Sequence, residues 1–368
     1  MKKKIKVLHV VSISFSIKYF IGNQFFFFKK RGYEFHVACT DSEDLRQLAD
    51  HFKFTPFPVP ILRNIAPLQD IKSIWELRNY IKKEKFDIVI AHSPKGGLIG
   101  MIASYLAGVK KRIFIRHGLV FETSSGLKKA LLINVERLIG LFSTKIVNVS
   151  PSVEKVATEL RLNLDSKNTL LGKGTYNGVN IDVYKADNNI KYDNTKVIGF
   201  VGRLAKDKGL NELIEAWKML IKEFNNIKLL LVGPIDERDP MELSVLEYMK
   251  NEKTIEFTGG VSDTSNYYNK MDVFVLPSLR EGFPTVVLEA SASELPIITT
   301  KATGCVDSII ENETGIFVDY SAQSLYNGIK YYLDNPLVAK NHGINGRSFV
   351  KNNFAEEILY TKIQEQLL

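Results

Sequence analysis

Two carboxylates eight residues apart raise the first chemical question. The stretch PSLREGFPTVVLE, residues 277–289, carries Glu281 and Glu289, with a glycine and a proline just after the first. A fully helical segment would separate the two by roughly 12 Å along its axis, whereas the carboxylate pairs of glycoside hydrolysis lie about 5–9.5 Å apart. The spacing therefore favours two separate contacts with one elongated, hydroxyl-rich ligand over an acid/nucleophile pair. The alternative, an exposed helix position for Glu289, is weakened by its apolar surroundings, TVVLEASA.

A second candidate site is the basic turn GRLAKDKG, residues 202–209. It follows a predicted strand and opens a predicted helix, whose first N–H groups are free to bind an anion. Arg203 and Lys208 add fixed positive charge, so the turn predicts a cradle for a diphosphate. A solvated basic turn is the alternative, and the sequence is not the GxxxxGK[ST] of a Walker A loop.

Two further features lie where predicted strands end. The loop TGCVD, residues 303–307, is expected to open a helix and to offer more backbone donors, and Cys305 in it is expected to be a packed side chain. Histidines are more often structural than catalytic, and a structural role is the alternative for His92 and His117; their positions at the ends of strands, beside a proline or a glycine, make them candidates for a site. The sequence has no D-x-D, no HExxH and no Cys/His cluster, so we expect no metal and no cofactor.

The elements that must position these residues alternate between short apolar runs and longer helical patterns. In the first half, the predicted strands are 5–11, 34–39, 86–91, 112–116 and 145–149, and the predicted helices are 21–31, 71–85, 97–107 and 127–142. In the second half, the predicted strands are 197–201, 228–232, 255–258, 272–276, 297–299 and 315–318, and the predicted helices are 210–224 and 285–294. This alternation is typical of parallel sheets covered on both faces.

The length of 368 residues favours two domains. We predict an α/β protein with two facing, Rossmann-like, doubly wound domains, whose strands point their carboxyl ends toward one cleft. The predicted ranges are an acceptor-binding domain at 1–178, a nucleotide-sugar domain at 179–345, and a C-terminal helical segment at 346–368 that packs back on the first domain. The aperiodic stretch Gly172–Tyr184 is the expected connection.

Three segments of the second half carry a resemblance to a known family. FVGRLAKDKGLNELIEAW, VLPSLREGFPTVVLEASASELPII and GCVDSIIENETGIFV closely resemble the nucleotide-sugar domain of retaining glycosyltransferase family 4, which has the GT-B fold. The E-x7-E element of that family corresponds to Glu281 and Glu289. Within the family, the chain looks most like bacterial N-acetylhexosaminyl transferases that act on polyprenyl-diphosphate-linked acceptors.

The resemblance implies a role for each matching residue. Arg203 and Lys208 would bind the donor diphosphate and stabilise its charge in place of a metal ion. Glu289 would hold the ribose hydroxyls, and Glu281 would face the donor sugar near its reacting carbon. Retaining members are thought to react by front-face attack, in which the departing phosphate takes the acceptor proton, so no protein nucleophile is required.

Other matching positions complete the implied substrate site. Gly282 and Phe283 would contact the sugar and phosphate through their backbone, and Val261 would lie beside the base. His117 matches a first-domain histidine near the donor sugar. Ser16 lies in the first-domain loop VSISFSIKYFIG, which lacks the paired glycines that many members carry there, and is assigned to substrate binding.

Charge is distributed unevenly between the two halves. Residues 1–178 hold 29 Lys+Arg and 14 Asp+Glu, a net charge of +15, and the remaining residues hold 20 and 27, a net charge of −7. The basic half suits an anionic partner, and an anionic membrane carrying a lipid-diphosphate acceptor is the candidate. The local features to test are the segments 25–31, FFFFKKR, and 127–133, LKKALLI, although both are also compatible with ordinary core helices.

The composition limits where the protein acts. The basic start Met1–Lys4 precedes a run that Lys6 and His9 interrupt, so we expect neither a secretory signal nor a spanning helix. Two distant cysteines suit a reducing compartment. We therefore expect a cytoplasmic protein that is peripheral on the inner face of the cell membrane.

The leading hypothesis is a transferase that moves sugar from a UDP-sugar to a polyprenyl-diphosphate-linked saccharide. A GT-B-fold epimerase or phosphorylase and a non-catalytic sugar-nucleotide-binding subunit are the alternatives. A dehydrogenase is disfavoured because the sequence lacks G-x-G-x-x-G, and nucleic acid is disfavoured because no basic motif is interleaved with aromatic residues.

Overall fold

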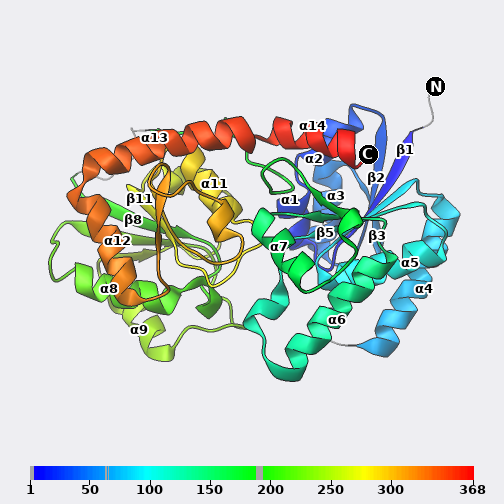
Figure 1. Ribbon diagram of the computed structural model, residues 1–368, viewed down its shortest axis with the longest axis horizontal. Helices are drawn as coiled ribbons and strands as arrows, with labels where there is room; N and C mark the ends of the chain where they lie inside the picture. The colour runs from blue at the N-terminus through cyan, green and yellow to red at the C-terminus, as the bar shows by residue number, and fades with distance from the viewer. Residues whose placement is uncertain (1–3, 63, 65, 188–193) are drawn as a thin grey trace. The chain divides into compact units, whose positions relative to one another are not determined.

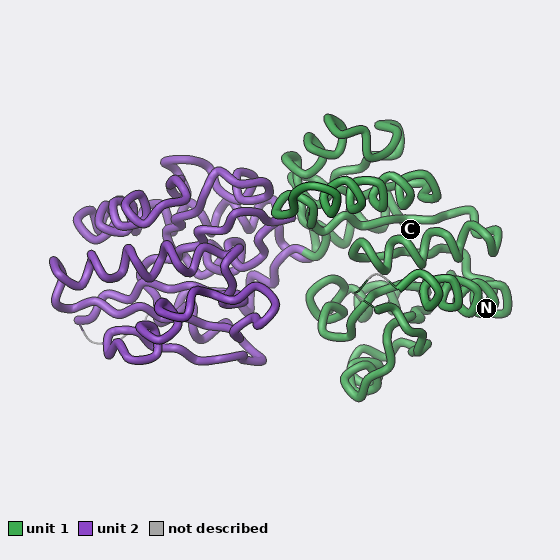
Figure 2. The backbone as a smooth tube through the Cα atoms, turned by 90° about the horizontal axis from the view of Figure 1, so that it is seen from below, with its two compact units in different colours: residues 1–177, 357–368 green, residues 178–356 purple. Residues whose placement is uncertain are grey.

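A computed structural model describes residues 4–62, 64, 66–187 and 194–368 of the chain. Residues 1–3, which hold most of the basic start, lie outside the described residues. Backbone contacts divide the chain into two compact units, residues 1–177 with 357–368 and residues 178–356 (Figure 2). The division falls within the expected connection Gly172–Tyr184. Residues 346–356, expected with the C-terminal segment, are part of the second unit, and the chain returns to the first unit only after them.

The first unit, whose strands β1, β2, β3 and β5 are labelled in Figure 1, is built on a seven-stranded sheet in the order β3-β2-β1-β4-β5-β6-β7. Every neighbouring pair in it is parallel. The order steps outward from β1 in both directions, which is the doubly wound arrangement. The strands are β1 (Ile5–Val10), β2 (Tyr33–Cys39), β3 (Thr55–Pro58), β4 (Ile88–His92), β5 (Lys111–Arg116), β6 (Lys145–Asn148) and β7 (Asn168–Leu170).

Helices connect these strands, and two of them begin at serine N-caps. The side-chain oxygen of Ser42 accepts a hydrogen bond from the backbone N–H of Leu45 at 3.1 Å, and that of Ser150 accepts from Val153 at 3.2 Å. The helices are α1 (Phe15–Phe20), α2 (Gln24–Lys29), α3 (Glu43–Phe52), α4 (Pro67–Glu84), α5 (Pro94–Leu106), α6 (Gly126–Phe142), α7 (Pro151–Glu159) and α14 (Glu356–Gln366), with short 3₁₀ turns at Val120–Thr123 and Asp165–Lys167.

The second unit repeats the plan with a six-stranded parallel sheet in the order β10-β9-β8-β11-β12-β13. Its strands are β8 (Lys196–Val201), β9 (Ile227–Val232), β10 (Ile255–Phe257), β11 (Val273–Leu276), β12 (Ile297–Thr300) and β13 (Gly315–Val318). Its helices are α8 (Leu210–Leu220), α9 (Leu243–Asn251), α10 (Ser265–Tyr268), α11 (Thr285–Ala292), α12 (Ala322–Asp334) and α13 (Pro336–Asn353), with 3₁₀ turns at Lys206–Lys208 and Cys305–Asp307.

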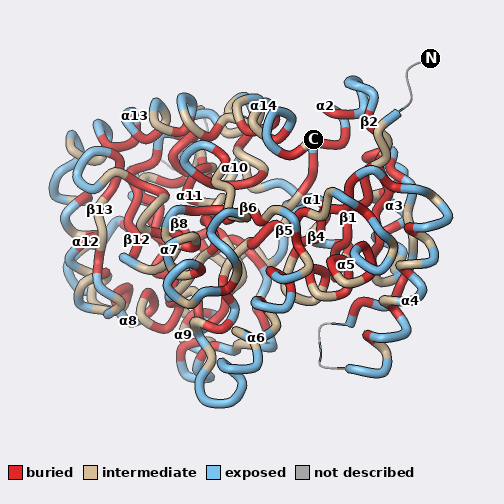
Figure 3. The backbone as a smooth tube through the Cα atoms, turned by 45° about the vertical axis from the view of Figure 1, so that its right-hand side comes forward, coloured by how far each residue is buried: buried red, intermediate tan, exposed pale blue. Residues whose placement is uncertain are grey.

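The central strands of both sheets are buried on their two faces, as is usual for parallel sheets, whereas the edge strands β3, β7 and β10 are less buried. Figure 3 shows the strands as buried chain and the solvent-facing turns of the helices as exposed chain. In the second unit the core contains the fully buried side chains of Trp217, Phe200 and Phe274. The predicted α/β class, with two Rossmann-like sheets, is confirmed.

The aromatic segment 25–28 lies largely inside the first unit. Phe25 and Phe28 are 1% exposed, and the ring of Phe27 lies 5.1 Å from that of Tyr360 on α14. Phe26, at 36% exposure, is the outermost of the four. The predicted helix 21–31 is shorter in the structure because Gly22, at φ +50°, separates α1 from α2. The segment is therefore mainly a core helix rather than a membrane-facing one. Across the described ranges, no helix is both long and apolar enough to cross a membrane.

Candidate functional site

The candidate site of the second unit is built from loops at the carboxyl ends of its strands. The loop 202–209 follows β8, the loop 233–242 follows β9, and the loop 277–284 follows β11. Backbone hydrogen bonds join them: the N–H of Leu204 donates to Pro234 O at 2.8 Å, and the N–H of Leu279 donates to Asp207 O at 2.9 Å. Because neighbouring parallel strands end at one edge, three distant segments of the sequence converge here.

Glycines make this convergence possible. A Cβ on Gly233, which has φ +139°, would lie 1.9 Å from the carbonyl oxygen of Gly202. A Cβ on Gly304, at φ +79°, would lie 2.6 Å from the oxygen of Gly282 and 2.7 Å from that of Glu281. Only residues without a side chain fit these positions. The loop after β12 therefore presses against the backbone of residues 281 and 282.

Lys208 and Glu281 form an ion pair in the second unit. Their side chains are only 14% and 16% exposed, so both charges are largely removed from water. Lys208 comes from the 3₁₀ turn after β8, and Glu281 comes from the loop after β11. The structure thus joins the predicted diphosphate-binding cation to the carboxylate predicted to face the sugar.

Arg203 belongs to the same charged network, with different partners. Its guanidinium pairs with Asp236 and lies 3.7 Å from a carboxylate oxygen of Asp207. The guanidinium of Arg280 donates to the other oxygen of Asp207 at 3.2 Å. Arg203 is 39% exposed, so it is the more accessible of the two predicted cradle cations.

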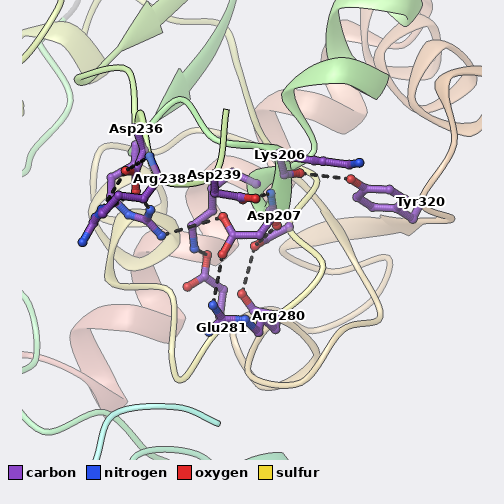
Figure 4. A network of polar contacts seen from close by, with 11 residues as sticks. Lys206, Asp207, Asp236, Arg238, Asp239, Arg280, Glu281 and Tyr320 are labelled. Atoms are coloured by element: carbon purple, nitrogen blue, oxygen red, sulfur yellow. Dashed lines mark hydrogen bonds and ion pairs between the residues drawn. The ribbon is translucent and has the colours of Figure 1, made fainter. Parts of the chain in front are cut away.

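Asp207 connects several groups of this network through its backbone and its carboxylate (Figure 4). Its backbone N–H donates to the carboxylate of Asp239 at 2.7 Å, and its carbonyl oxygen accepts from the hydroxyl of Ser278 at 3.2 Å. Its carboxylate receives Arg280. The sequence reasoning missed Asp207, Asp236, Asp239 and Arg280. A carboxylate between the two lysines of KDK was a signal for Asp207, whereas nothing local pointed to the loop after β9.

Glu289 lies on α11 and has partners different from those of Glu281. The hydroxyl of Tyr268 donates to its carboxylate at 2.7 Å, and the hydroxyls of Tyr184 and Thr264 lie 3.2 Å apart beside it. Burial raises the pKa of Glu289 to about 7, although these hydroxyls favour the ionised form. The structure gives the two carboxylates separate surroundings, one cationic and one made of hydroxyls.

The remaining predicted residues of the second unit flank these carboxylates. Gly282 contributes backbone to the contact with Gly304. Phe283 is 9% exposed and packs against Phe354, with ring centroids 5.2 Å apart. Val261 is half-buried against the apolar core in the loop between β10 and α10.

In the first unit, His117 follows β5 and is joined to other histidines. Its Nε2 lies 2.9 Å from Nδ1 of His92, and Nε2 of His92 lies 3.0 Å from Nδ1 of His9. Burial lowers the pKa of His117 and of His9 to about 3. The other predicted first-unit residue, Ser16, is half-buried on α1, and its N–H donates to Ile13 O at 3.1 Å. Sequence reasoning missed His9 because it lies within a strand.

The described residues include no group of three or more His, Cys, Asp or Glu side chains placed to hold a metal ion. The loop ends carry lysines, arginines and backbone N–H groups, together with the carboxylates that pair with them. The cations and N–H groups bind anions and stabilise negative charge that develops during a reaction. Beside them, hydroxyl-rich contacts around Glu289 suit a polyhydroxylated ligand.

The sequence of the chain is similar to those of sugar-transferring enzymes. Residues 184–349 match the family model described as glycosyl transferases group 1, and residues 6–150 match the one described as glycosyl transferase 4-like. The chain is similar to the capsular polysaccharide biosynthesis glycosyltransferase CapM of Staphylococcus aureus, with 33% identity over 98% of this chain and 96% of that protein.

Two more distant proteins extend the comparison. One is the Escherichia coli UDP-Gal:alpha-D-GlcNAc-diphosphoundecaprenol alpha-1,3-galactosyltransferase, which is 26% identical over 95% of this chain and 94% of its own length. The other is a solved structure, that of Anabaena Alr3699/HepE in complex with UDP and glucose. It covers 99% of both chains with a TM-score of 0.81 at 16% identity, a likeness of fold.

Proposed function

The chain belongs to the group 1 glycosyl transferases, and on that premise we propose that it is a retaining, metal-independent transferase with a UDP-sugar donor. The proposed acceptor is a saccharide linked to polyprenyl diphosphate, and the proposed donor sugar is an N-acetylhexosamine. The product would enter a capsule or another cell-surface polysaccharide. The place of CapM in capsular polysaccharide biosynthesis supports the pathway, and the activity of the E. coli relative supports a UDP-sugar donor and a diphosphoundecaprenol acceptor.

The ion pair between Lys208 and Glu281 is the observation that carries this proposal. In the reaction, the bond between the anomeric carbon and the β-phosphate oxygen breaks, and negative charge collects on the departing diphosphate. Lys208 and Arg203 stabilise that charge, a role a preorganised cation performs well in a poorly hydrated site. Glu281, held beside Lys208, lies next to the position proposed for the reacting end of the sugar.

No protein nucleophile takes part in this scheme. The acceptor hydroxyl attacks from the face that the diphosphate leaves, its oxygen bonds to the anomeric carbon, and its proton goes to the departing phosphate oxygen. The anomeric configuration is thereby retained. Cys305, the thiol nearest to the network, is fully buried, and burial raises its pKa to about 12, so it is not a competing nucleophile.

The other site residues hold the donor along its length. Glu289 accepts hydrogen bonds from the ribose hydroxyls, and Val261 lies beside the base. Gly282 and Phe283 contact the sugar and phosphate through their backbone. In the first unit, the proposal assigns substrate contacts to His117 and Ser16.

An anionic membrane surface is the proposed location of the acceptor, and our proposal puts the chain in the cytoplasm, peripheral on the inner face of the cell membrane. The start of α6 supports it: Leu127 is 91% exposed and Leu131 46% exposed, with Lys128 and Lys129 between them. Exposed leucines next to lysines suit the boundary between lipid headgroups and acyl chains. The segment 25–28 contributes less, because Phe25 and Phe28 are in the core.

A donor screen followed by turnover tests the proposed function. Thermal unfolding would be measured with UDP-, GDP- and ADP-sugars, and the donor that stabilises the protein would then be incubated with a polyprenyl-diphosphate-linked saccharide. We expect UDP release that depends on the acceptor and a product with the donor's anomeric configuration. Release of UDP without an acceptor would point to an epimerase or hydrolase. Binding without any turnover would point to a non-catalytic sugar-nucleotide-binding subunit.

A further inference from the structure

Three neighbouring strands of the first unit each present a histidine at the carboxyl edge of the sheet. His9 lies on β1, His92 ends β4, and His117 directly follows β5, in the spatial order β1-β4-β5. The rings form a nearly parallel series, with centroids 5.2 Å apart at both steps and interplanar angles of 25° and 24°. His9 is 2% exposed and His92 is fully buried, so the series runs from the interior of the unit to the half-buried His117.

Aromatic side chains hold the series in place. Phe20 stacks on His117 with ring centroids 3.8 Å apart and an interplanar angle of 9°. Tyr176, 2% exposed, stands perpendicular to the ring of His117 at 89° and near-perpendicular to that of His92 at 67°. Phe25 and Phe35 surround the inner end at His9. None of the described carboxylates is hydrogen-bonded to any of the three imidazoles.

Hydrogen bonding between neutral imidazoles couples their tautomers. Each neutral ring carries one N–H and one bare nitrogen, so a ring that accepts at Nε2 must carry its proton on Nδ1. The contacts run from Nδ1 of His9 to Nε2 of His92, and from Nδ1 of His92 to Nε2 of His117. The three hydrogen-bonded histidines can therefore place their ring protons in only two ways, with all three protons on Nδ1 or all three on Nε2.

The surroundings of His9, at the buried end of the three histidines, determine which of the two proton placements is favoured. Among the described residues, the hydrogen bond to His92 is the one that His9 makes. A proton on Nε2 of His9 would leave a buried donor without an acceptor, and orphaned buried N–H groups are rarer than orphaned acceptors. A proton on Nδ1 of His9 has His92 as its acceptor. Burial also lowers the pKa of all three imidazoles, so the rings are neutral at physiological pH.

We propose that His92 is a positioning residue that, together with His9, locks His117 in the Nδ1–H tautomer, so that His117 presents a hydrogen-bond donor at its open ring nitrogen. A fixed donor selects an oxygen acceptor on the substrate, such as a sugar hydroxyl or the carbonyl of an N-acetyl group. Histidine in water favours the Nε2–H tautomer, so an unconstrained His117 would have to change tautomer before it could donate from Nδ1. Fixing the Nδ1–H tautomer in advance removes that free-energy cost at binding. The role toward substrate rests on the proposed function, whereas the tautomer itself does not.

Nuclear magnetic resonance of the full chain labelled with ¹⁵N-histidine tests the lock directly. The chain has six histidines, and the signals of the three are assigned by single substitutions. We expect His117 to be neutral and in the Nδ1–H form between about pH 5.5 and 8. In His92→Phe, which removes both ring nitrogens but keeps an aromatic ring, His117 should shift toward Nε2–H. His342, bonded to Tyr332 at 2.8 Å in the other unit, is the control whose tautomer should not change.

Kinetics tests whether the lock serves the reaction. We expect His92→Phe to lower kcat/KM by about 10- to 100-fold, the usual effect of removing a partner that orients a functional imidazole. Because His92 acts through His117, the double variant His92→Phe/His117→Phe should be no slower than His117→Phe alone. Where the phenylalanine disturbs folding, His92→Asn retains a polar group near the Nδ1 position and should recover part of the loss.

The two readouts separate the possible failures. An Nε2–H or protonated His117 in the unsubstituted chain overturns the lock, whatever the activity. Additive losses in the double variant overturn the positioning role. An Nδ1–H His117 in a protein that transfers no sugar with any donor would leave the lock standing and refute the proposed function.

Discussion

Replacing Glu289 with glutamine should make the protein more stable and a poorer binder of nucleotide. In the free protein, burial raises the pKa of this carboxyl from 4.5 to about 7. The folded state therefore holds a proton that the unfolded chain has lost between these two values. Folding stability consequently falls as the pH rises from about 4.5 to about 7, and the loss is complete above that range.

The size of this effect follows from the same two values. A difference between 4.5 and about 7 corresponds to about 3 kcal/mol of lost stability at pH 8, at about 1.4 kcal/mol for each pH unit. Glutamine has nearly the same shape, is neutral at every pH, and can still accept the hydrogen bond from Tyr268. Glu289→Gln should therefore unfold about 6–12 °C higher than the unsubstituted protein at pH 8, and close to it at pH 4.5.

The assay compares the two proteins by calorimetry between pH 4.5 and 8.5 and by UDP titration over the same range. Glu247→Gln on α9 provides the control, because it removes the same charge from an exposed helical position. Loss of a charged acceptor for the ribose hydroxyls should weaken UDP binding by about 10- to 100-fold at pH 8. The ratio of the two affinities should shrink toward one as Glu289 becomes protonated below pH 6.

Two results would refute the reasoning. If Glu289→Gln were less stable at pH 8, the carboxylate would be a favourable structural charge rather than one held ready for a ligand. If the affinity ratio did not change with pH, the ionised carboxylate would not be the group that binds the ribose. A gain in stability coupled to a loss of binding is the mark of a functional site.

Three further predictions test the site and the membrane surface. Lys208→Ala should lower kcat by about 100- to 1,000-fold, whereas Lys206→Ala, exposed in the same turn, should have little effect; equal rates would remove the cradle assignment. Gly304→Ala should lose stability and activity because its Cβ would collide with the backbone of 281 and 282, while Gly259→Ala, at φ +71° in open space, should show only the backbone cost of about 1 kcal/mol. Leu127→Ser/Leu131→Ser should weaken co-sedimentation with phosphatidylglycerol vesicles at least 10-fold, and Leu243→Ser, 77% exposed on α9, should not; binding unaffected by the double change would exclude the start of α6 as the contact.

Much of the fold could be predicted because buried parallel strands are continuous apolar runs. The predicted strand 5–11 is β1 (Ile5–Val10), and the predicted strand 112–116 is β5 (Lys111–Arg116). The strand β3 was missed since its sequence, TPFP, contains two prolines, which cannot donate to a ladder. The two prolines are tolerated in the structure because β3 is the edge strand of its sheet.

The candidate site was less predictable than the fold, because several of its contacts depend on which strands and loops are neighbours in space. Arg203, Lys208 and Glu281 could be predicted as candidates because each lies in a loop between a predicted strand and a predicted helix. The partners Asp236 and Asp239 lie in a loop whose own sequence signals a turn and nothing more. In the first unit, the link between His9 and His92 depends on β1 and β4 being neighbours, although 83 residues separate the two histidines.

If Lys208 and Arg203 bind the donor diphosphate as proposed, their pairing with carboxylates has a consequence for turnover. Lys208 is bonded to Glu281 and Arg203 to Asp236, so a bound diphosphate must compete with carboxylates for both cations. Its net binding energy is then the difference between two sets of ion pairs, which is much smaller than that of a diphosphate meeting unpaired cations. Tight binding of ground state and product alike would not accelerate the reaction and would slow the release of UDP. The charge that grows on the departing phosphate, by contrast, strengthens its attraction to cations already held in place. In the proposed mechanism, the carboxylates keep the cations oriented and leave most of the cations' attraction for the transition state.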